Sequence, residues 1–444
     1  MERNEKERVD ILNGNIALTL FRLCLPILIC GIAQQIYNMC DLAIVGKIDE
    51  RSVAIISGSS SLLSSVATNF VGGLVSGAIV IIGNAYGRGN QKEVEKTIIT
   101  AFLLMGGMTL LFVFLYFLFG TPVLRFLNVP YTMLSDSSRF LKVYSIGFFG
   151  YGMFQLSINI LRSFGETRKP TLLLINSFIL NIIFDFLIIV VLKAGYLGVG
   201  FAYILTQFVS FGLAFKVIKK DVKLSSHLEF DHEIAFSILK VGIPSAIISL
   251  AFSLTSTYVQ SFFNLLGETW ISAYGVYAKF ERIFWIVMNG LQLSLCTFIA
   301  QNYGARNYTR IHRGIRIAGL IFVSATAGCS LAVLMGSSHF ISLFLSNPET
   351  IENCLKIIRF MAPFYPAYAL IELFTGIFKG TKKANIPLVL NLLFICLLRY
   401  LWLSLYARNH LTYLNICWCW PISWFVSSAA YLMMYLIKKK NIFV

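Results

Sequence analysis

PILICGIAQQIYNMCDLAIVG, residues 26–46, is the stretch that decides how the rest of the chain is interpreted. It is apolar enough to span a bilayer, yet it contains Gln34, Tyr37, Asn38 and Asp41. Because these four residues are spaced by three or four positions, a helix places them on one face. A carboxylate at membrane depth is costly, so such a face usually borders a bundle interior or a watery cavity. The alternative is an aspartate hydrated at the membrane interface.

Pro26 begins this stretch and predicts a second feature of the helix. A proline cannot donate to the carbonyl four residues earlier, here that of Arg22, so it weakens or kinks the helix at that point. Two interpretations stay open. Pro26 is either a mobile hinge that lets the cavity change shape or a static kink of the kind that neighbouring groups stabilise in membrane helices.

The composition of the whole chain predicts a helical membrane protein with the lipid bilayer as its surroundings. Of 444 residues, 57% are hydrophobic and 13% charged, with a mean hydropathy of +0.74. A soluble protein has about 25% charged residues. The nine cysteines lie almost wholly in apolar segments. Cys417 and Cys419 lack the partner pair that a zinc site needs, so no metal is predicted there.

Long apolar runs and their breakers predict an all-α fold with twelve transmembrane helices. The first run is too long for the core of a signal peptide, so we interpret it as a span. The predicted spans cover residues 16–46, 53–85, 96–120, 139–164, 171–193, 196–219, 235–266, 270–302, 314–345, 354–379, 386–408 and 412–437.

The positions of Lys and Arg predict the orientation. With the N-terminus inside, 25 of the 37 fall on the inner side of the membrane. This excess predicts that both termini are cytoplasmic and that the protein spans the cell membrane many times. It also explains the net charge of +16, so nucleic-acid binding is not needed to account for the basic balance.

An internal repeat predicts two six-helix bundles. Pro26 and Pro244 open corresponding spans 218 positions apart, and AYGRGN (85–90) recurs as NYGARN (302–307). We therefore predict an N-lobe over 1–215, a cytoplasmic linker over 216–232 and a C-lobe over 233–444. An even number of spans gives both lobes the same orientation, so a pseudo-twofold axis along the membrane normal should relate them.

The fifth span supplies a partner for Asp41. Ser177, Asn181 and Asp185 share one helical face, and Asp185 is fifteen residues beyond Pro170, as Asp41 is beyond Pro26. Both carboxylates should therefore lie at one level in the membrane. Two neighbouring buried carboxylates do not readily both ionise, and this property suits a site that couples transport to protons.

Other polar and small residues in the spans leave alternatives open. Gln155 and Asn159 in the fourth span either face the same cavity or bond between helices. Gly72, Gly73, Ser76 and Gly77 predict close helix packing in the second span.

The C-lobe lacks acids that match Asp41 and Asp185. Glu281 is expected to form a structural cluster with Lys279 and Arg282. Glu372 suits either packing near the cytoplasmic side or a cavity.

The chain resembles the multidrug and toxic compound extrusion (MATE) transporters over nearly its whole length. The resemblance rests on the order and spacing of short matching segments. These segments are Pro26, DLAIVG (41–46), GNAYGRGN (83–90), RSFGETRKP (162–170), Asn181 with Asp185, LGVGFAYILTQ (197–207) and IAQNYGARN (299–307). It implies alternating access and antiport of organic cations or amphipathic compounds against H⁺ or Na⁺. It also implies that Asp41 and Asp185 are the coupling carboxylates, with Tyr37 and Asn181 beside them. Tyr203 departs from the family, which often has a small hydroxyl residue there.

We therefore predict a multidrug exporter with no cofactor, acting as a monomer on small amphipathic or cationic molecules. The cavity residues are predicted to be Gln34, Tyr37, Asn38, Gln155, Asn159, Asn181 and Tyr203. If Na⁺ is the coupling ion, Asp41, Asp185 and Asn181 would bind it. The alternative is a flippase for lipid-linked sugars, for which Lys279, Arg282 and Arg399 would supply basic groups. An enzyme is not expected, because the five histidines fall in or near loops or span ends.

Overall fold

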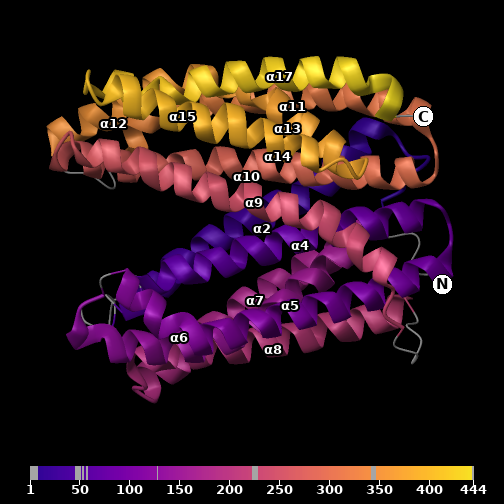
Figure 1. The fold of residues 1–444 in the computed structure, drawn as a ribbon, viewed down its shortest axis with the longest axis horizontal. Coiled ribbons are helices and arrows are strands. Elements are labelled where there is room, and N and C mark those ends of the chain that lie inside the picture. The colour runs from indigo at the N-terminus through magenta and orange to yellow at the C-terminus, as the bar shows by residue number, and fades with distance from the viewer. Residues whose placement is uncertain are drawn as a thin grey trace. The chain divides into compact units, whose positions relative to one another are not determined.

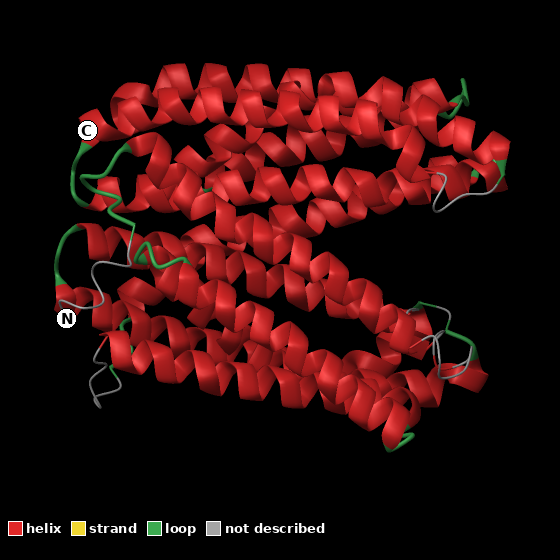
Figure 2. Cartoon of the chain, turned by 180° about the vertical axis from the view of Figure 1, so that it is seen from behind, coloured by secondary structure: helices red, strands yellow, loops and turns green. Residues whose placement is uncertain are grey.

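The structure, a computed structural model, describes residues 9–45, 52, 55–56, 59–127, 129–222, 229–341 and 347–442. Within its helices, the side chains of residues 37–45, 59–63, 338–340 and 439–442 are outside the description. All the regular elements in these ranges are helices (Figure 2).

The first six predicted spans each coincide with a helix (Figure 1). The helices are α2 (Ile16–Val45), α4 (Ser59–Gly87), α5 (Gln91–Phe126), α6 (Tyr131–Ser163), α7 (Arg168–Asp185) and α8 (Gly195–Val222). A π-helical segment, Phe186–Val191, prolongs α7.

The last six spans also coincide with helical segments, several of them interrupted. They are α9 (His232–Asn264), α10 (Glu268–Gly304), α11 (Tyr308–Ile341), α12 (Pro348–Met361) continuing into α13 (Tyr365–Gly380), α14 (Asn385–Asn391) continuing into α15 (Leu398–Leu401), and α16 (Tyr413–Cys417) leading into α17 (Cys419–Ile442). π-helical turns interrupt the eleventh span at Leu392–Leu397 and Trp402–Ala407.

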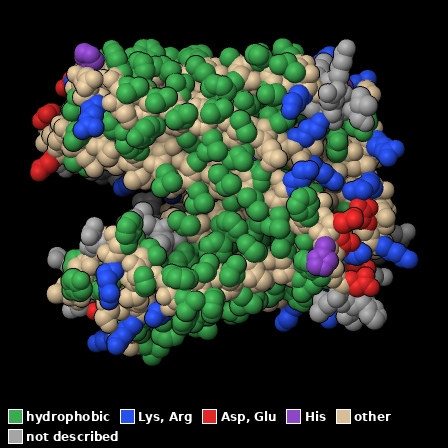
Figure 3. All heavy atoms as spheres, viewed as in Figure 1, with side chains coloured by type: hydrophobic (Ala, Val, Ile, Leu, Met, Phe, Trp, Pro, Cys, Tyr) green, Lys and Arg blue, Asp and Glu red, His purple; other side chains and the backbone are tan. Residues whose placement is uncertain are grey.

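The apolar character of these helices confirms the prediction of a twelve-helix membrane protein. Among the described residues, eleven helical segments are long and apolar enough to cross a bilayer, and α6 is a further helix of 33 residues with more polar side chains. On the face shown in Figure 3, hydrophobic side chains cover the long sides of the helices while Lys and Arg gather toward helix ends. Large apolar side chains such as Phe114, Phe186 and Phe425 are more than half exposed, as expected where lipid is the solvent.

The described residues divide into two compact units. The first contains Leu25–Ala246 together with the residues before Ile11, and the second contains Ile11–Cys24 and the chain from Ile247 onward. The division falls inside α2 one residue before Pro26, and inside α9 three residues after Pro244. The linker over residues 216–232 was inferred from the repeat in the sequence, and it stays a prediction.

The backbone repeats the same turns in both halves of the chain. Gly89 (φ 73°) and Arg306 (φ 56°) are left-handed residues 217 positions apart, and so are Gly165 (φ 78°) and Lys382 (φ 63°). The hydrogen bonds repeat too, since the amides of Gly89 and Arg306 each donate to the carbonyl of a tyrosine three residues earlier, at 3.0 and 3.2 Å. The internal repeat is therefore a repeat of structure.

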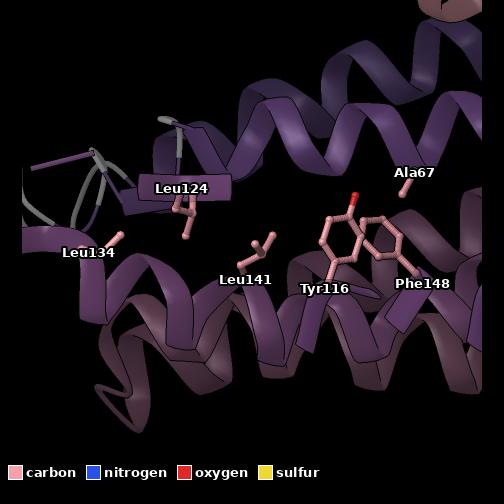
Figure 4. Close-up of a cluster of buried hydrophobic side chains, with 6 residues drawn as sticks. All are labelled: Ala67, Tyr116, Leu124, Leu134, Leu141 and Phe148. Atoms are coloured by element: carbon pink, nitrogen blue, oxygen red, sulfur yellow. The ribbon is translucent and has the colours of Figure 1, made fainter. Parts of the chain in front are cut away.

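Aromatic and aliphatic side chains from α4, α5 and α6 form a core in the first unit (Figure 4). Tyr116 stacks on Phe148 with ring centroids 5.8 Å apart, and its hydroxyl bonds to the backbone of Ala67. Leu124, Leu134 and Leu141 continue this core along α5 and α6. The tyrosine thus buries its ring while its polar atom is satisfied by a backbone group.

Glycines let α4 approach the first part of α9 closely. A Cβ atom on Gly77 would meet the carbonyl oxygen of Ile238, and it would lie 2.8 Å from the amide nitrogen of Gly242. Gly73 lies equally close to the backbone of Ala246. The predicted role of these small residues in close packing is therefore observed at Gly73 and Gly77, whereas the Cα of Gly72 faces open space.

The beginning of α9 is tied to α5 through Asp231. Its carboxylate accepts a hydrogen bond from the amide of Ile234 at 2.9 Å and pairs with the ammonium of Lys96 at 2.9 Å. Its own amide donates to the hydroxyl of Thr100 at 3.2 Å. The backbone hydrogen bond from Ile234 and then Lys96 lower the pKa of Asp231 below its ordinary value of 3.8.

Gly77→Ala should destabilise the protein, because the added methyl group meets backbone that cannot move independently. We expect a loss of about 1–3 kcal/mol, seen as a lower melting midpoint in detergent. Gly72→Ala is the matched control, since its methyl group enters open space and alanine favours the helix by about 1 kcal/mol. Equal midpoints for the two variants would contradict the close contact of α4 with α9.

Asp231→Asn should lower the melting midpoint at about pH 7, and the difference from wild type should shrink toward acid pH. Because its folded pKa is lowered, the carboxylate stabilises the fold above its ordinary pKa of 3.8. That stabilisation disappears as the pH falls through the lowered pKa. Melting curves of both proteins between about pH 7 and pH 3 test this; a constant difference across the range would refute it.

Candidate functional site

The predicted polar face of α7 is buried against α8 in the first unit. Asn181 donates from its side-chain amide to the hydroxyl of Thr206 at 3.1 Å, and the hydroxyl of Ser210 donates to that of Ser177 at 2.9 Å. Both bonds join the two helices at membrane depth. Ser177, Asn181 and Asp185, which are spaced four residues apart in the sequence, therefore lie on one face of α7.

Asp185 is the last residue of this face and of α7. Its side chain is only 1% exposed, and the chain continues from it into the π-helical segment Phe186–Val191. A carboxylate enclosed in this way is costly to ionise. π-helical turns within helices are frequent at functional sites, so the geometry and the residue type agree.

The predicted partners of Asp185 on α2 are only partly described. The backbones of Tyr37, Asn38 and Asp41 belong to α2, but their side chains lie outside the described residues. Gln34 is described and is exposed. The proximity of Asp41 to Asp185 therefore stays a prediction.

Asn159 and Gln155, two polar residues of α6, differ in their contacts. The side chain of Asn159 is buried, and its amide donates to the backbone carbonyl of Gln155 at 2.8 Å while its oxygen faces Arg162 at 3.4 Å. These contacts within α6 favour the packing interpretation for Asn159. Gln155 is half-buried beside the hydroxyl of Tyr151.

Tyr203 on α8 is held as part of an aromatic stack. Its ring lies 4.1 Å from that of Tyr144 at an angle of 10°, and Gly147 presses against it with no room for a Cβ atom. Tyr203 is half-buried. The large side chain at this position is accommodated because α6 supplies a glycine opposite it.

The second unit contains a cavity of about 300 Å³. The sequence predicted it only in part, through one of the two interpretations of Glu372 and through Arg399 in the flippase alternative. Four ionisable side chains line it, two acidic and two basic: Glu281, Glu372, Lys379 and Arg399. Aromatic rings from Phe252, Tyr274, Trp285, Tyr368 and Trp420 form much of the remaining wall. The mixture of rings with few charged groups is typical of pockets for small molecules.

Each acidic side chain of this cavity is held by a tyrosine one turn earlier on its helix. Tyr277 donates to Glu281 at 3.1 Å on α10, and Tyr368 donates to Glu372 at 2.6 Å on α13. Of the two interpretations of Glu372, the structure shows the one in which it lines a cavity.

The interpretation of Glu281 as a member of a cluster with Lys279 and Arg282 is wrong. Glu281 is 8% exposed, while Lys279 and Arg282 are exposed. Residues one or two positions apart on a helix point to different faces, so these cations do not share the face of Glu281.

Arg399 is the buried cation of the cavity. It is 4% exposed, its Nε donates to the hydroxyl of Ser423 at 2.9 Å, and its guanidinium carbon lies 5.8 Å from the ring centroid of Trp420. Thr206 and Ser423 are 217 positions apart, and Asn181 and Arg399 are 218 apart. The two bonds are therefore equivalent in the repeat, with an amide in the first unit and a guanidinium in the second.

The sequence does contain a signal for this cavity. Tyr274, Glu281, Trp285 and Gln292 follow one face of α10, and on α13 the same holds for 368, 372, 375 and 379. Both faces mix aromatic and polar residues as residues 34–41 do. These cavity residues of α10 and α13 are missed when only acids equivalent to Asp41 and Asp185 are sought.

The sequence of this chain matches a known protein family and several known proteins. The sequence profile of the MatE family matches residues 26–187 and 244–402. The chain is similar to the probable multidrug resistance protein YpnP of Bacillus subtilis, with 23% identity over 403 residues and 90% of both chains covered. It is also similar to an FAD transporter of Shewanella oneidensis, with 22% identity over 404 residues and 88% of both chains covered.

A solved structure shares the fold. The crystal structure of MATE in complex with MaD5 has a TM-score of 0.89 at 17% identity, covering 98% of this chain and 99% of that chain.

Asn181→Ala and Thr206→Ala should show non-additive effects on stability, because each removes one partner of a buried hydrogen bond. We expect a coupling of about 1 kcal/mol in a double-mutant cycle of detergent melting. Pairing Asn181→Ala with Ser210→Ala provides the control, since Ser210 bonds to Ser177. A coupling no larger than in this control would show that Asn181 does not depend on Thr206.

Proposed function

Since the chain belongs to the MATE family of transporters, we propose that it exports organic cations or other amphipathic compounds in exchange for H⁺ or Na⁺, by alternating access. The protein carries no cofactor in this proposal. Its energy source is the gradient of the coupling ion, and its substrates are small molecules that partition between water and the apolar wall of a cavity.

The observation that carries the proposal is the burial of Asp185. A carboxylate that is 1% exposed at membrane depth is retained at a large cost in solvation, which points to a functional role. Such a group exchanges a proton or binds a cation with a large change in local charge. Hydroxyl and amide groups of Ser177, Asn181 and Thr206 follow the same contact between α7 and α8, and they supply oxygen atoms suited to a hard cation.

Asp41 completes the coupling site in this proposal. It and Asp185 form the pair of carboxylates, and Gln34, Tyr37 and Asn38 extend the polar face of α2. If the ion is Na⁺, Asp41, Asp185 and Asn181 bind it; if it is H⁺, the carboxylates share it. Gln155, Asn159 and Tyr203 are proposed to contribute to the cavity wall, with Asn159 in a supporting role because its own helix satisfies it.

Pro26 is proposed as the point at which α2 changes its bend during transport. It lies inside the helix, and the boundary between the two compact units falls beside it. A helix without a donor at this position can adopt a second bend at modest cost. Removal of the charge on Asp41 would then bias the bend.

The location proposed for the protein is the cell membrane, with both termini in the cytoplasm. The distribution of Lys and Arg supports this orientation. We propose a monomer, because one chain already contains both six-helix lobes of the repeat.

The substrate stays open between several classes. One relative is named a probable multidrug resistance protein and another an FAD transporter, so similarity at about 20% identity does not select a compound. The flippase alternative is less well supported, because the relatives that the chain resembles are named as probable multidrug resistance proteins and an FAD transporter.

Asp185→Asn should abolish gradient-driven export while the protein remains folded. The amide keeps the size of the carboxylate but neither titrates nor binds a cation as a charge does. Efflux of the cationic dye ethidium from proteoliposomes, driven in turn by a pH gradient and a Na⁺ gradient, measures the effect and identifies the ion. We expect at least a tenfold loss, of the size that follows from about 1.4 kcal/mol or more.

Glu352→Gln is the control for this experiment, because Glu352 is an exposed acid that pairs with Lys356. It should transport at the wild-type rate. If Asp185→Asn transports as well as this control, the coupling site lies elsewhere.

A further inference from the structure

The guanidinium of Arg399 is enclosed but largely unbonded. An arginine has five N–H donors, and in the part of the chain that the structure describes Arg399 uses only Nε, toward Ser423. Its Nη2 is buried without a hydrogen-bond partner among the described residues. A charged donor left in this condition carries a large desolvation cost.

The carboxylates of the same cavity do not supply the missing partner. None of the ion pairs found among the described residues involves Arg399. Glu281 is held by Tyr277 on α10, and Glu372 by Tyr368 on α13. Since neither acid pairs with the guanidinium, its Nη2 is left for another acceptor.

The residues that line the cavity around Arg399 indicate which kind of molecule would carry the hydrogen-bond acceptor. The ring of Trp420 lies beneath the guanidinium at 5.8 Å, and Phe252, Tyr274 and Trp285 line the same cavity of about 300 Å³. Aromatic walls favour a flat aromatic body. A guanidinium binds carboxylate or phosphate through two parallel hydrogen bonds, a geometry that an ammonium cannot reproduce.

We propose that this cavity of the second unit binds an aromatic compound that bears a carboxylate or phosphate, with the acidic group held by Arg399. The inference names a substrate class for the proposed exporter and in that respect rests on it. The site itself is separate from the carboxylate Asp185 of the first unit. The amide of Asn181 bonds to Thr206 at the corresponding place in the first unit, where Arg399 bonds to Ser423 in the second.

Binding is tested on the purified full-length chain in detergent, with intrinsic tryptophan fluorescence as the readout, because Trp420 and Trp285 line the cavity. The probes are benzoate, phenyl phosphate, and the neutral benzyl alcohol. We expect saturable quenching in which at least one acidic probe binds tenfold or more tightly than benzyl alcohol. Benzoate and phenyl phosphate distinguish the two acids, and whichever binds more tightly identifies the preferred group.

Arg399→Gln should weaken binding of the preferred acidic probe about tenfold or more and leave benzyl alcohol unaffected. Arg399→Lys keeps the charge but loses the paired donors, so its affinity should fall between those of wild type and Arg399→Gln. Arg282→Gln is the matched control, since Arg282 is exposed on α10 and does not line the cavity. Size-exclusion profiles and melting midpoints establish that each variant is folded.

Equal affinity of wild type for the acidic and neutral probes would overturn the proposal without any variant. So would unchanged binding of the acidic probe by folded Arg399→Gln, or binding of inorganic phosphate as tight as that of phenyl phosphate. None of these measurements uses an ion gradient. Failure of the exporter proposal, seen as dye transport that ignores both gradients, is therefore distinguishable from failure of this site.

Discussion

A helix inside a bilayer must satisfy its own backbone, and its polar side chains are usually satisfied in the same way. In this chain Thr109, Ser157 and Thr326 each donate to the carbonyl four residues earlier on their own helix. Against this background, a polar side chain that bonds to another helix is informative. The bonds from Asn181 to Thr206 and from Arg399 to Ser423 are of that kind, and both belong to the sites for which a role is proposed.

The fold could be predicted from the sequence because length and apolarity nearly determine a membrane helix. The twelve spans, the repeat offset near 217 and the close packing at Gly77 all follow from spacing and side-chain size. The burial of Asp185 agrees with its place on the polar face that the spacing predicts for α7. Helix interruptions were not predictable, since the π-helical turns in the eleventh span have no proline or glycine to mark them.

The cavity of the second unit could not be predicted fully from the spacing of residues in the sequence. Glu281, Lys279 and Arg282 are neighbours in sequence, and only the rotation of α10 within its bundle separates the buried acid from the exposed cations. That rotation depends on packing against other helices, which charge counting does not contain. The sequence offered Arg399 only as a basic group of the flippase alternative, because its contacts with Ser423 and Trp420 come from a different helix.

The left-handed turns show which property the two halves of the chain share. Glycine occupies positions 89 and 165 without strain, whereas arginine and lysine at 306 and 382 bear a backbone cost of about 1 kcal/mol each. The turn geometry is common to both halves although the residue that adopts it differs. The exchange of glycine for a cation therefore leaves the path of the backbone unchanged and costs only local strain.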